Sequence, residues 1–524
     1  MDDGVNNGGG LKGGFVFAAL AVFAAAVLSF AAVWMGGLNQ DEGWYLYAAN
    51  LVAEGKMLYR DFFYTQGPLM PIVYSAFTAV WKGFGILGAR VFTLSLGFSG
   101  VVLACALAAR LAPRGRKAAA ALTVALLLGS NLYHLYYIAI PKTYALASLF
   151  VVVGFFFLSF LPARAGGGSW ARALAFGTGA GLSLALAAGT RISLGILLCT
   201  AGTWLLVSRR WRELVAFCVG GFGGLALVYG PFLLDADAFA GLVAAQRYHA
   251  ARGGFDPVWT VGSVSRLVRW YLPVFVVLGM GVAFAASGRA GGGGENDEPA
   301  APRAIAPLLL VSFAAVFLVQ MLAPFPYEDY QVPVMGIVAA FAAAKFARGG
   351  AGTQTLRMVL VLGLAWASTF GSPLLERWTT NGQDRFWSLK KSAFELKQLR
   401  DVARRIEALD PGGREIFTQD LYLAVETGRK VPAGLEMGPF SMLSDERWRE
   451  LLSSAPCEIA AFSGYAFAID PPKCDERPVE RQIEYWEALK RNYELVDREE
   501  AFGQNATTLL VLRRKASAGK GTPQ

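Results

Sequence analysis

Charged side chains are scarce in this sequence, and histidine is almost missing. Asp, Glu, Lys and Arg make up only 17% of the 524 residues, and the two histidines are His134 and His249. So few histidines exclude a zinc site built mainly from imidazole ligands. Soluble domains average about 25% charged residues, so this composition does not suit an ordinary soluble protein.

Cysteine is also scarce, with five in the whole chain, which excludes a disulfide-rich scaffold. Cys105, Cys199 and Cys218 lie in apolar runs, where they are small apolar residues. Cys457 and Cys474 lie near the C-terminus, and both a disulfide and two unpaired thiols stay open for them. The sequence also lacks a glycine-rich phosphate loop, so no nucleotide-binding motif is evident.

Apolar residues are abundant, at 55% of the chain with a mean hydropathy of +0.42. They fall into runs of about 17 to 23 residues, the length that crosses a hydrocarbon core of about 30 Å. These runs predict about eleven transmembrane helices, at about Gly14–Met35, Leu87–Leu111, Ala118–Tyr137, Ile140–Leu161, Ala171–Ala188, Ile192–Val207, Leu214–Leu233, Leu267–Ala286, Ile305–Ala323, Val332–Phe346 and Leu356–Phe370.

The basic residues between the runs indicate the topology. The segment Pro68–Trp81 is excluded as a span because about 14 residues at 1.5 Å per residue reach only about 21 Å, so it is expected to be interfacial or re-entrant. With that exclusion the basic clusters at 110–117, 164–172, 209–212, 289–303 and 345–357 all lie on the side of the N-terminus. The positive-inside rule then predicts a multi-pass plasma (inner) membrane protein with a cytoplasmic N-terminus and an extracytoplasmic C-terminal region.

Two domains follow from the change in composition. Residues 1–373 are predicted to form an all-α polytopic membrane domain, in which an outer loop at 36–87 contains interfacial helices. Residues 374–524 are charged and mixed, and are predicted to form a small extracytoplasmic α/β domain. In it EIFTQ and TTLLVLRR are predicted strands and SLKKSAFELKQLRDVARRIEAL is a predicted helix. The glycine-rich stretch near 290–302 is expected to be a cytoplasmic linker.

The first outer loop carries the acidic pair Asp41 and Glu42 just before a short helical pattern. The residues that share one face of that pattern predict an amphipathic helix on the membrane surface: Trp44, Tyr47, Ala48, Leu51 and Val52. Asp41 is therefore a candidate catalytic carboxylate on the outer face. Capping of the helix N-terminus is an equally ordinary role for it.

The arrangement resembles the GT-C superfamily, the polyprenyl- or dolichyl-phosphate-sugar-dependent glycosyltransferases that include protein O-mannosyltransferases and the lipid A aminoarabinose transferase. The similar features are the first span, the acidic pair, the helix YLYAANLVAEGKMLY and the QGPL segment, then Arg90, the PK before the fourth span, the GTR that ends at Arg191, and PYEDYQVPV. They cover roughly residues 10–370. The resemblance implies that Asp41, with Glu42, acts on the acceptor.

Sugar transfer from a lipid phosphate needs a base for the acceptor hydroxyl and cations for the departing phosphate. Asp41 is the candidate base. The candidate phosphate ligands lie in or beside outer loops, and Arg191 is the first choice because guanidinium matches phosphate oxygens; the others are Lys142, Lys56, Arg60, Arg247 and Arg252. An interfacial cation that reaches lipid headgroups is the alternative for Arg191 and Lys142.

Glu328, Asp329 and Tyr330 form a second candidate group, which would orient the acceptor or line the cavity. A solvated turn between two spans is the alternative for the two acids. Members of the superfamily often carry an acid in the second outer loop, but this chain has Lys142 there. No cofactor is required by the expected chemistry, although a divalent cation on oxygen ligands stays open.

The predicted function is an inverting, membrane-embedded glycosyl transfer from a polyprenyl-phosphate sugar to a glycan, lipid or protein of the cell envelope. Membrane lipids are expected partners and nucleic acid is not. The rival interpretations are a transporter or flippase of lipid-linked sugars and an inert assembly subunit. A transporter would show internal repeats or ionisable residues at mid-span, and neither is clear in the sequence.

Overall fold

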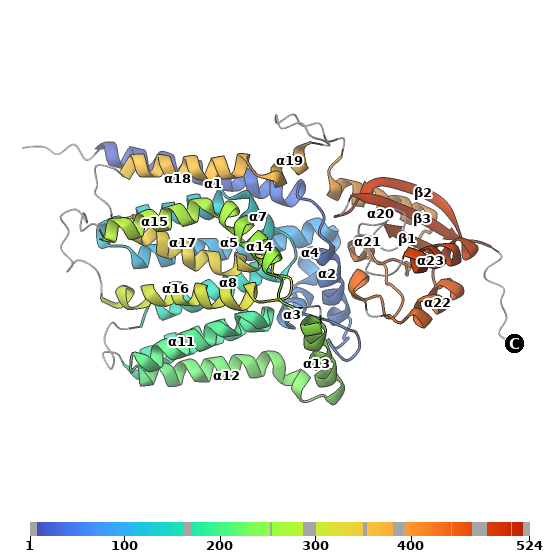
Figure 1. Cartoon of the computed structure of the whole chain (residues 1–524), viewed down its shortest axis with the longest axis horizontal. Coiled ribbons are helices and arrows are strands. Elements are labelled where there is room, and N and C mark those ends of the chain that lie inside the picture. Colours follow the sequence, from blue (N-terminus) through green and yellow to red (C-terminus); the bar gives the residue numbers. More distant parts are fainter. Residues whose placement is uncertain are drawn as a thin grey trace, which may run out of the picture.

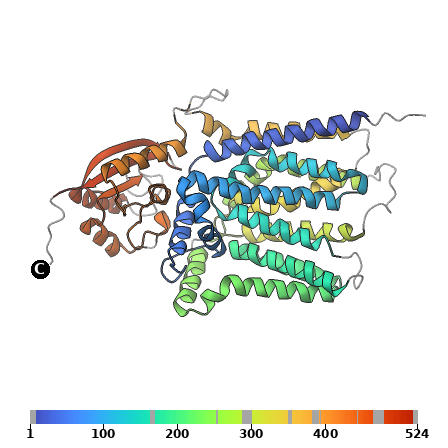
Figure 2. The same cartoon turned by 180° about the vertical axis from the view of Figure 1, so that it is seen from behind.

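The computed structural model describes residues 8–161, 169–251, 254–286, 300–348, 354–380, 391, 393–441, 443–463, 479–504 and 506–516. The molecule is elongated (Figure 1). A bundle of roughly parallel helices forms one end and a small domain with a sheet forms the other, with a layer of short helices between them (Figures 1 and 2).

All eleven predicted runs are helical in the structure. Long or near-continuous helices are α1 (Gly8–Trp34), α5 (Gly85–Leu111), α12 (Trp211–Leu233) and α16 (Ala300–Met321). Shorter ones are α8 (Thr143–Leu158), α9 (Trp170–Ala173), α10 (Gly179–Thr190), α11 (Ile196–Val207) and α17 (Val332–Phe346), with a π-helical turn, Leu174–Thr178, between α9 and α10. Gly181 of α10 packs directly on the backbone of α12, and Gly220 of α12 packs directly on the backbone of the π-helical turn at Thr178.

Two of the predicted spans contain a break, and a third is followed by one. α6 (Lys117–Gly129) bends by 74° into α7 (Leu132–Ala139), α14 (Pro257–Trp270) by 77° into α15 (Leu272–Ala286), and α18 (Gln354–Phe370) by 52° into α19 (Pro373–Thr379). By length and composition, four helices in the described part of the chain are able to cross a membrane, or up to seven if each bent pair is one span. This is the pattern of a multi-pass membrane protein, but the count of eleven spans is not confirmed.

The layer at the domain-bearing end of the bundle is formed by α2 (Gln40–Ala53), α3 (Leu69–Ala76), α4 (Thr78–Trp81) and α13 (Ala236–Ala251) (Figure 1). The segment excluded as a span accordingly forms two short helices here. The predicted amphipathic character of α2 is wrong, because residues 42–49 are buried without a break. α2 is enclosed by the bundle on one side and by the C-terminal domain on the other.

The C-terminal domain contains α20 (Glu395–Leu409), α21 (Leu421–Thr427), α22 (Asp445–Ser454) and α23 (Val479–Asn492) around an antiparallel sheet. The sheet has the order β1-β3-β2, from β1 (Ile459–Ser463), β2 (Tyr493–Phe502) and β3 (Thr507–Arg514). β3 and α20 were predicted. EIFTQ makes only isolated bridges, one of them between Phe417 and Ala460, and so is not a sheet strand.

The C-terminal domain and α2 share one hydrophobic core. Leu46 and Tyr47 of α2 belong to the same buried cluster as Leu399 and Tyr422. A side chain at Gly43 would collide with the backbone nitrogen of Tyr422, so the two elements are in direct contact. The predicted boundary near residue 373 therefore separates two compositions, while the packing joins both parts.

The cysteine question is settled only in part. Cys457 is a buried free thiol, and burial raises its pKa to about 12. Cys474, the other cysteine near the C-terminus, lies outside the described residues.

Candidate active site

The start of α2 presents Asp41 to a cavity. The cap of this helix is Asn39, whose side-chain oxygen accepts a hydrogen bond from the Asp41 amide at 3.0 Å. Glu42 completes the capping box by accepting from the Asn39 amide at 2.9 Å. Because Asn39 caps the helix, the carboxylate of Asp41 is available for other contacts, and its side chain is 25% exposed.

Glu42 points away from that cavity into the protein. Its carboxylate forms a two-pronged pair with Arg90, at 2.7 Å to Nε and 2.7 Å to Nη2, and both side chains are fully buried. Arg90 also donates to the carbonyl oxygens of Val33, Gly36 and Gly37. This pair therefore ties the end of α1 to the start of α2 and α5, and it fixes the backbone on which Asp41 stands.

The carboxylate of Asp41 forms an ion pair with Lys142. Its Oδ1 accepts from Trp44 Nε1 at 3.1 Å, and its Oδ2 lies 2.7 Å from Lys142 Nζ. The same ammonium lies 3.4 Å from Asp329 Oδ2, which also accepts from the Tyr144 hydroxyl at 2.8 Å. Burial favours a neutral amine, but the carboxylates of Asp41 and Asp329 hold the pKa of Lys142 well above its ordinary value.

Arg191 enters the cavity from the end of α10. It leaves the helix in an extended conformation, and its guanidinium lies 5.1 Å from the ring centre of Tyr144 and 4.4 Å from that of Tyr330. Within the described part of the chain its side chain makes one hydrogen bond, a long one of 3.5 Å to the Thr143 hydroxyl. Most of its five N–H donors are therefore available to an anion.

These side chains line one cavity of about 380 Å³, the carboxylate cavity. The bundle and the α2 layer provide most of its wall, including Trp44, Tyr45, Gln66, Tyr248 and Tyr327, and Glu328, which pairs with Arg266 at 3.0 Å. The C-terminal domain adds Phe440 and Gln504. Aromatic faces, carboxylates and two cations in one cavity suit a polyhydroxylated ligand that carries a negative charge.

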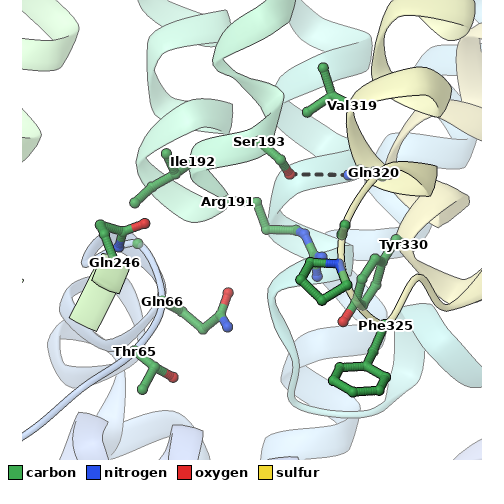
Figure 3. Close-up of a pocket in the computed structure, with 13 residues that line it drawn as sticks. Thr65, Gln66, Arg191, Ile192, Ser193, Gln246, Val319, Gln320, Phe325 and Tyr330 are labelled. Atoms are coloured by element: carbon green, nitrogen blue, oxygen red, sulfur yellow. Dashed lines mark hydrogen bonds between the residues drawn. The ribbon is translucent and has the colours of Figure 1, made fainter. Parts of the chain in front are cut away.

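Two further spaces adjoin the carboxylate cavity. An antechamber of about 340 Å³ shares Arg191, Tyr330 and Gln66 with it and is walled by Ser193 and Gln320, which are hydrogen-bonded at 3.1 Å (Figure 3). Figure 3 shows Arg191 and Tyr330 facing Gln66 and Gln246 across this space.

An apolar groove of about 530 Å³ adjoins the antechamber through their common wall residues Ile192 and Gln246. It runs between α11 and α12, and its lining is almost wholly apolar or small: Ala188, Gly195, Leu198, Cys199, Gly202, Phe217, Cys218, Gly221, Phe222, Leu225, Tyr229 and Leu242. The antechamber, which Arg191 shares with the carboxylate cavity, thus connects that polar cavity with the apolar groove.

The structure gathers six of the residues singled out from the sequence around the carboxylate cavity: Asp41, Lys142, Arg191, Glu328, Asp329 and Tyr330. It does not bring the others there. Glu42 is buried with Arg90, Lys56 and Arg247 are exposed outside the cavity wall, and Arg60 pairs with Asp61 and Asp235. Arg252 lies outside the described residues.

Several wall residues were missed from the sequence. Trp44 and Gln66 stand in the segments that carried the superfamily resemblance, YLYAANLVAEGKMLY with its preceding acidic pair and QGPL, so a signal was present for them. Phe440 and Gln504 lie about 400 and about 460 residues along the chain from Asp41 and carry no local signal. Only the docking of the C-terminal domain brings them to the cavity.

No group of three or more His, Cys, Asp or Glu side chains is arranged to hold a metal ion in the described part of the chain. The two acids that face each other, Asp41 and Asp329, are already bridged by the ammonium of Lys142.

No protein-family model matches the chain, and a search of curated proteins finds no match. Solved structures do match. ArnT from Cupriavidus metallidurans in the apo state has a TM-score of 0.64 at 15% identity, and covers 97% of this chain and 99% of its own. The same protein bound to undecaprenyl phosphate has a TM-score of 0.60 at 14% identity over the same shares.

The archaeal oligosaccharyltransferase AglB from Archaeoglobus fulgidus, in complex with an inhibitory peptide and a dolichol-phosphate, has a TM-score of 0.51 at 11% identity. It covers 86% of this chain and 69% of its own. The likeness to ArnT spans both the helical bundle and the C-terminal domain. This chain therefore shares the fold of ArnT and, over most of its length, that of AglB.

Proposed function

We propose that this chain is an integral membrane glycosyltransferase that moves a sugar from a polyprenyl-phosphate donor to a hydroxyl group of a cell-envelope acceptor. The carboxylate cavity and the C-terminal domain are placed on the extracytoplasmic face of the plasma membrane in this proposal. The basic clusters at the opposite ends of the spans support that orientation. The acceptor is a glycan, a lipid or a protein.

One observation carries the proposal. Arg191, whose guanidinium makes only one long hydrogen bond in the described structure, stands between a carboxylate cavity that contains Asp41 and an apolar groove between α11 and α12. A lipid phosphate sugar has the same three parts in the same order: a sugar, a phosphate and a prenyl chain. The likeness of the fold to a protein solved with undecaprenyl phosphate supports the match.

A second side chain at the junction suits the phosphate. The Nε2 atom of Gln246 is buried and has no hydrogen-bond partner in the described structure. Gln246 lines both the antechamber and the apolar groove. A buried donor without an acceptor costs about 1–3 kcal/mol, which a phosphate oxygen from the donor would recover.

The proposed step is a single displacement with inversion at the anomeric carbon. The acceptor O–H gives its proton to a carboxylate oxygen of Asp41 while the acceptor oxygen forms the new bond to carbon. The bond from that carbon to the phosphate oxygen breaks, and its electron pair stays on the phosphate, where Arg191 stabilises the charge.

The test is sugar transfer by purified wild type and by Asp41→Asn, with a panel of polyprenyl-phosphate sugars and membrane-extract acceptors. Asn preserves the size of Asp41 and removes the base, so we expect transfer to fall about 10²- to 10⁴-fold. Donor binding, measured with a fluorescent polyprenyl phosphate, should persist. Asp61→Asn, in the same outer loop but paired with Arg60 outside the cavity, is the control and should transfer normally.

Undiminished transfer by Asp41→Asn would remove Asp41 from the mechanism. If wild type binds the donor and transfers no sugar from the panel to any acceptor, the proposal of an enzyme fails and an inert subunit replaces it. If wild type moves labelled donor across liposome membranes without transfer, the protein is a flippase.

A further inference from the structure

The side chain of Lys142 is enclosed by acidic and aromatic side chains of the carboxylate cavity. Its ammonium lies 2.7 Å from Asp41 Oδ2 and 3.4 Å from Asp329 Oδ2, and the side chain is 9% exposed. Tyr137 and Tyr144 enclose it further, with ring centres 5.7 Å and 5.0 Å from Nζ. The cation is therefore held between two carboxylates from different loops and two aromatic faces.

Two carboxylates at one cavity repel each other unless a positive charge lies between them. In many proteins that charge is a divalent cation, which takes oxygen ligands from acidic side chains and from water. Here the second outer loop supplies the charge itself, because Lys142 stands immediately before α8 and its amine reaches Asp41. The ammonium satisfies both acids and fills the space between them.

The contacts of Arg191 differ from those of Lys142, which indicates that the two cations have separate roles. Arg191 is directed at Tyr144 and Tyr330, and no ion pair joins it to an acid in the described structure. Lys142 is instead committed to carboxylates. One cation is thus available to a ligand, and the other is part of the wall.

We propose that Lys142 is a built-in substitute for a divalent cation: it holds Asp41 and Asp329 in place, makes the site independent of metal ions, and keeps metal ions out. The inference about metal independence of transfer rests on the proposed function. The inference about metal exclusion does not, since it concerns only the three side chains.

The first experiment therefore measures metal binding without any turnover, on the full-length protein in detergent. Tb³⁺ is the probe, because Trp44 donates a hydrogen bond to Asp41 and is close enough to sensitise terbium emission at the site. We expect Lys142→Ala to gain a saturable, Ca²⁺-displaceable site at least about tenfold tighter than any in wild type, because removal of the ammonium leaves two unopposed carboxylates.

The matched control is the double variant Lys142→Ala with Asp329→Asn, in which one carboxylate is neutralised and the gained emission should disappear. Equal emission from wild type and Lys142→Ala overturns metal exclusion. So does emission from Lys142→Ala that survives the Asp329→Asn change, since the ion would then lie elsewhere. Lys142→Arg keeps the charge and should behave as wild type.

The second experiment measures transfer and needs no variant to fold. Wild-type transfer should be unchanged, within about twofold, by EDTA, because the charge that a metal ion would supply is covalently attached. Loss of wild-type transfer on chelation, with recovery by Mg²⁺ or Mn²⁺, overturns metal independence. Lys142→Ala should lose transfer and regain part of it when Mn²⁺ is added. Lys142→Arg, which keeps the positive charge, should transfer sugar like wild type. If wild type transfers no sugar, the proposed function fails and the terbium result alone decides the exclusion.

Discussion

At the scale of single residues, two arginines show how contacts separate structure from function. Arg90 is fully buried, and its donors go to Glu42 and to three carbonyl oxygens. Arg191 is aimed at a cavity and makes one long hydrogen bond in the described structure. A guanidinium whose donors are satisfied holds backbone segments together, whereas one with spare donors is ready for an anion.

The prediction for Arg191 concerns the replacement by lysine. Arg191→Lys keeps the charge but removes the planar fork that binds two phosphate oxygens at once, which costs about 1.5–3 kcal/mol. We therefore expect kcat/KM for the donor to fall about 10- to 100-fold. Steady-state kinetics with a polyprenyl-phosphate sugar measure it. Arg60→Lys, at a cation that pairs with Asp61 and Asp235, should leave the kinetics unchanged, and an equal loss there would assign the effect to overall charge.

The prediction for Arg90 concerns stability. Arg90→Met leaves Glu42 as a buried carboxylate without its partner. The free energy of unfolding should therefore fall by about 3–5 kcal/mol. Thermal unfolding of the purified protein in detergent measures the change. Arg449→Met breaks a half-exposed pair with Glu484, which is worth about 0–1 kcal/mol, and serves as the control. Similar melting temperatures for both variants would show that the Arg90 pair is not structural.

At the scale of elements, the apolar groove depends on glycines of α11 and α12. Gly202 lies in the wall of the groove, whereas nothing lies within 4 Å of a side chain built at Gly223 of α12, which is not part of that wall. Gly202→Leu should narrow the groove and raise KM for a long-chain donor about tenfold, since overpacking costs about 1–3 kcal/mol. A donor with one or two isoprene units should be affected less.

Gly223→Leu is the matched control, because it adds the same side chain on the outer surface of the same bundle. The native thiols of Cys199 and Cys218, both in the groove wall, give an independent measurement. Undecaprenyl phosphate should slow their reaction with a maleimide in wild type. If it does not, or if Gly223→Leu matches Gly202→Leu, the prenyl chain lies elsewhere.

The elements also show what sequence can and cannot predict here. Long apolar runs predicted where the bundle helices lie, because membrane burial imposes a length that hydropathy detects. The breaks between α6 and α7 and between α14 and α15 were not predicted, because an apolar run continues through a bend. The environment of α2 was predicted wrongly for a related reason, since the domain that covers it lies more than 300 residues away along the chain.

At the scale of the whole molecule, the C-terminal domain is part of the site rather than an appendage. Phe440 and Gln504 line the carboxylate cavity, and the Gln504 side chain accepts from the Gln40 amide at 2.8 Å. Glu395 at the start of α20 accepts from the Leu38 amide at 2.6 Å. The segment that presents Asp41 is therefore held by the C-terminal domain, in addition to the pair of Glu42 with Arg90 in the bundle. Asp41 and Arg191 were predictable from local sequence, but this support was not, since it arises only when the chain ends meet.

The last prediction tests that support at Asp420, which joins the two domains. The Oδ1 atom of this buried carboxylate accepts from Gln40, Tyr422 and the Ser463 hydroxyl, and Oδ2 accepts from the Ser463 amide. Asp420→Asn places an NH₂ group opposite one of these donors, and an unsatisfied buried donor costs about 1–3 kcal/mol. We expect a lower melting temperature and, because α2 loses its fixed position, lower transfer with unchanged donor binding. Asp497→Asn, at a partly exposed ion pair on β2, should change neither quantity appreciably. Normal transfer by a destabilised Asp420→Asn protein would show that the C-terminal domain stabilises the fold without positioning Asp41.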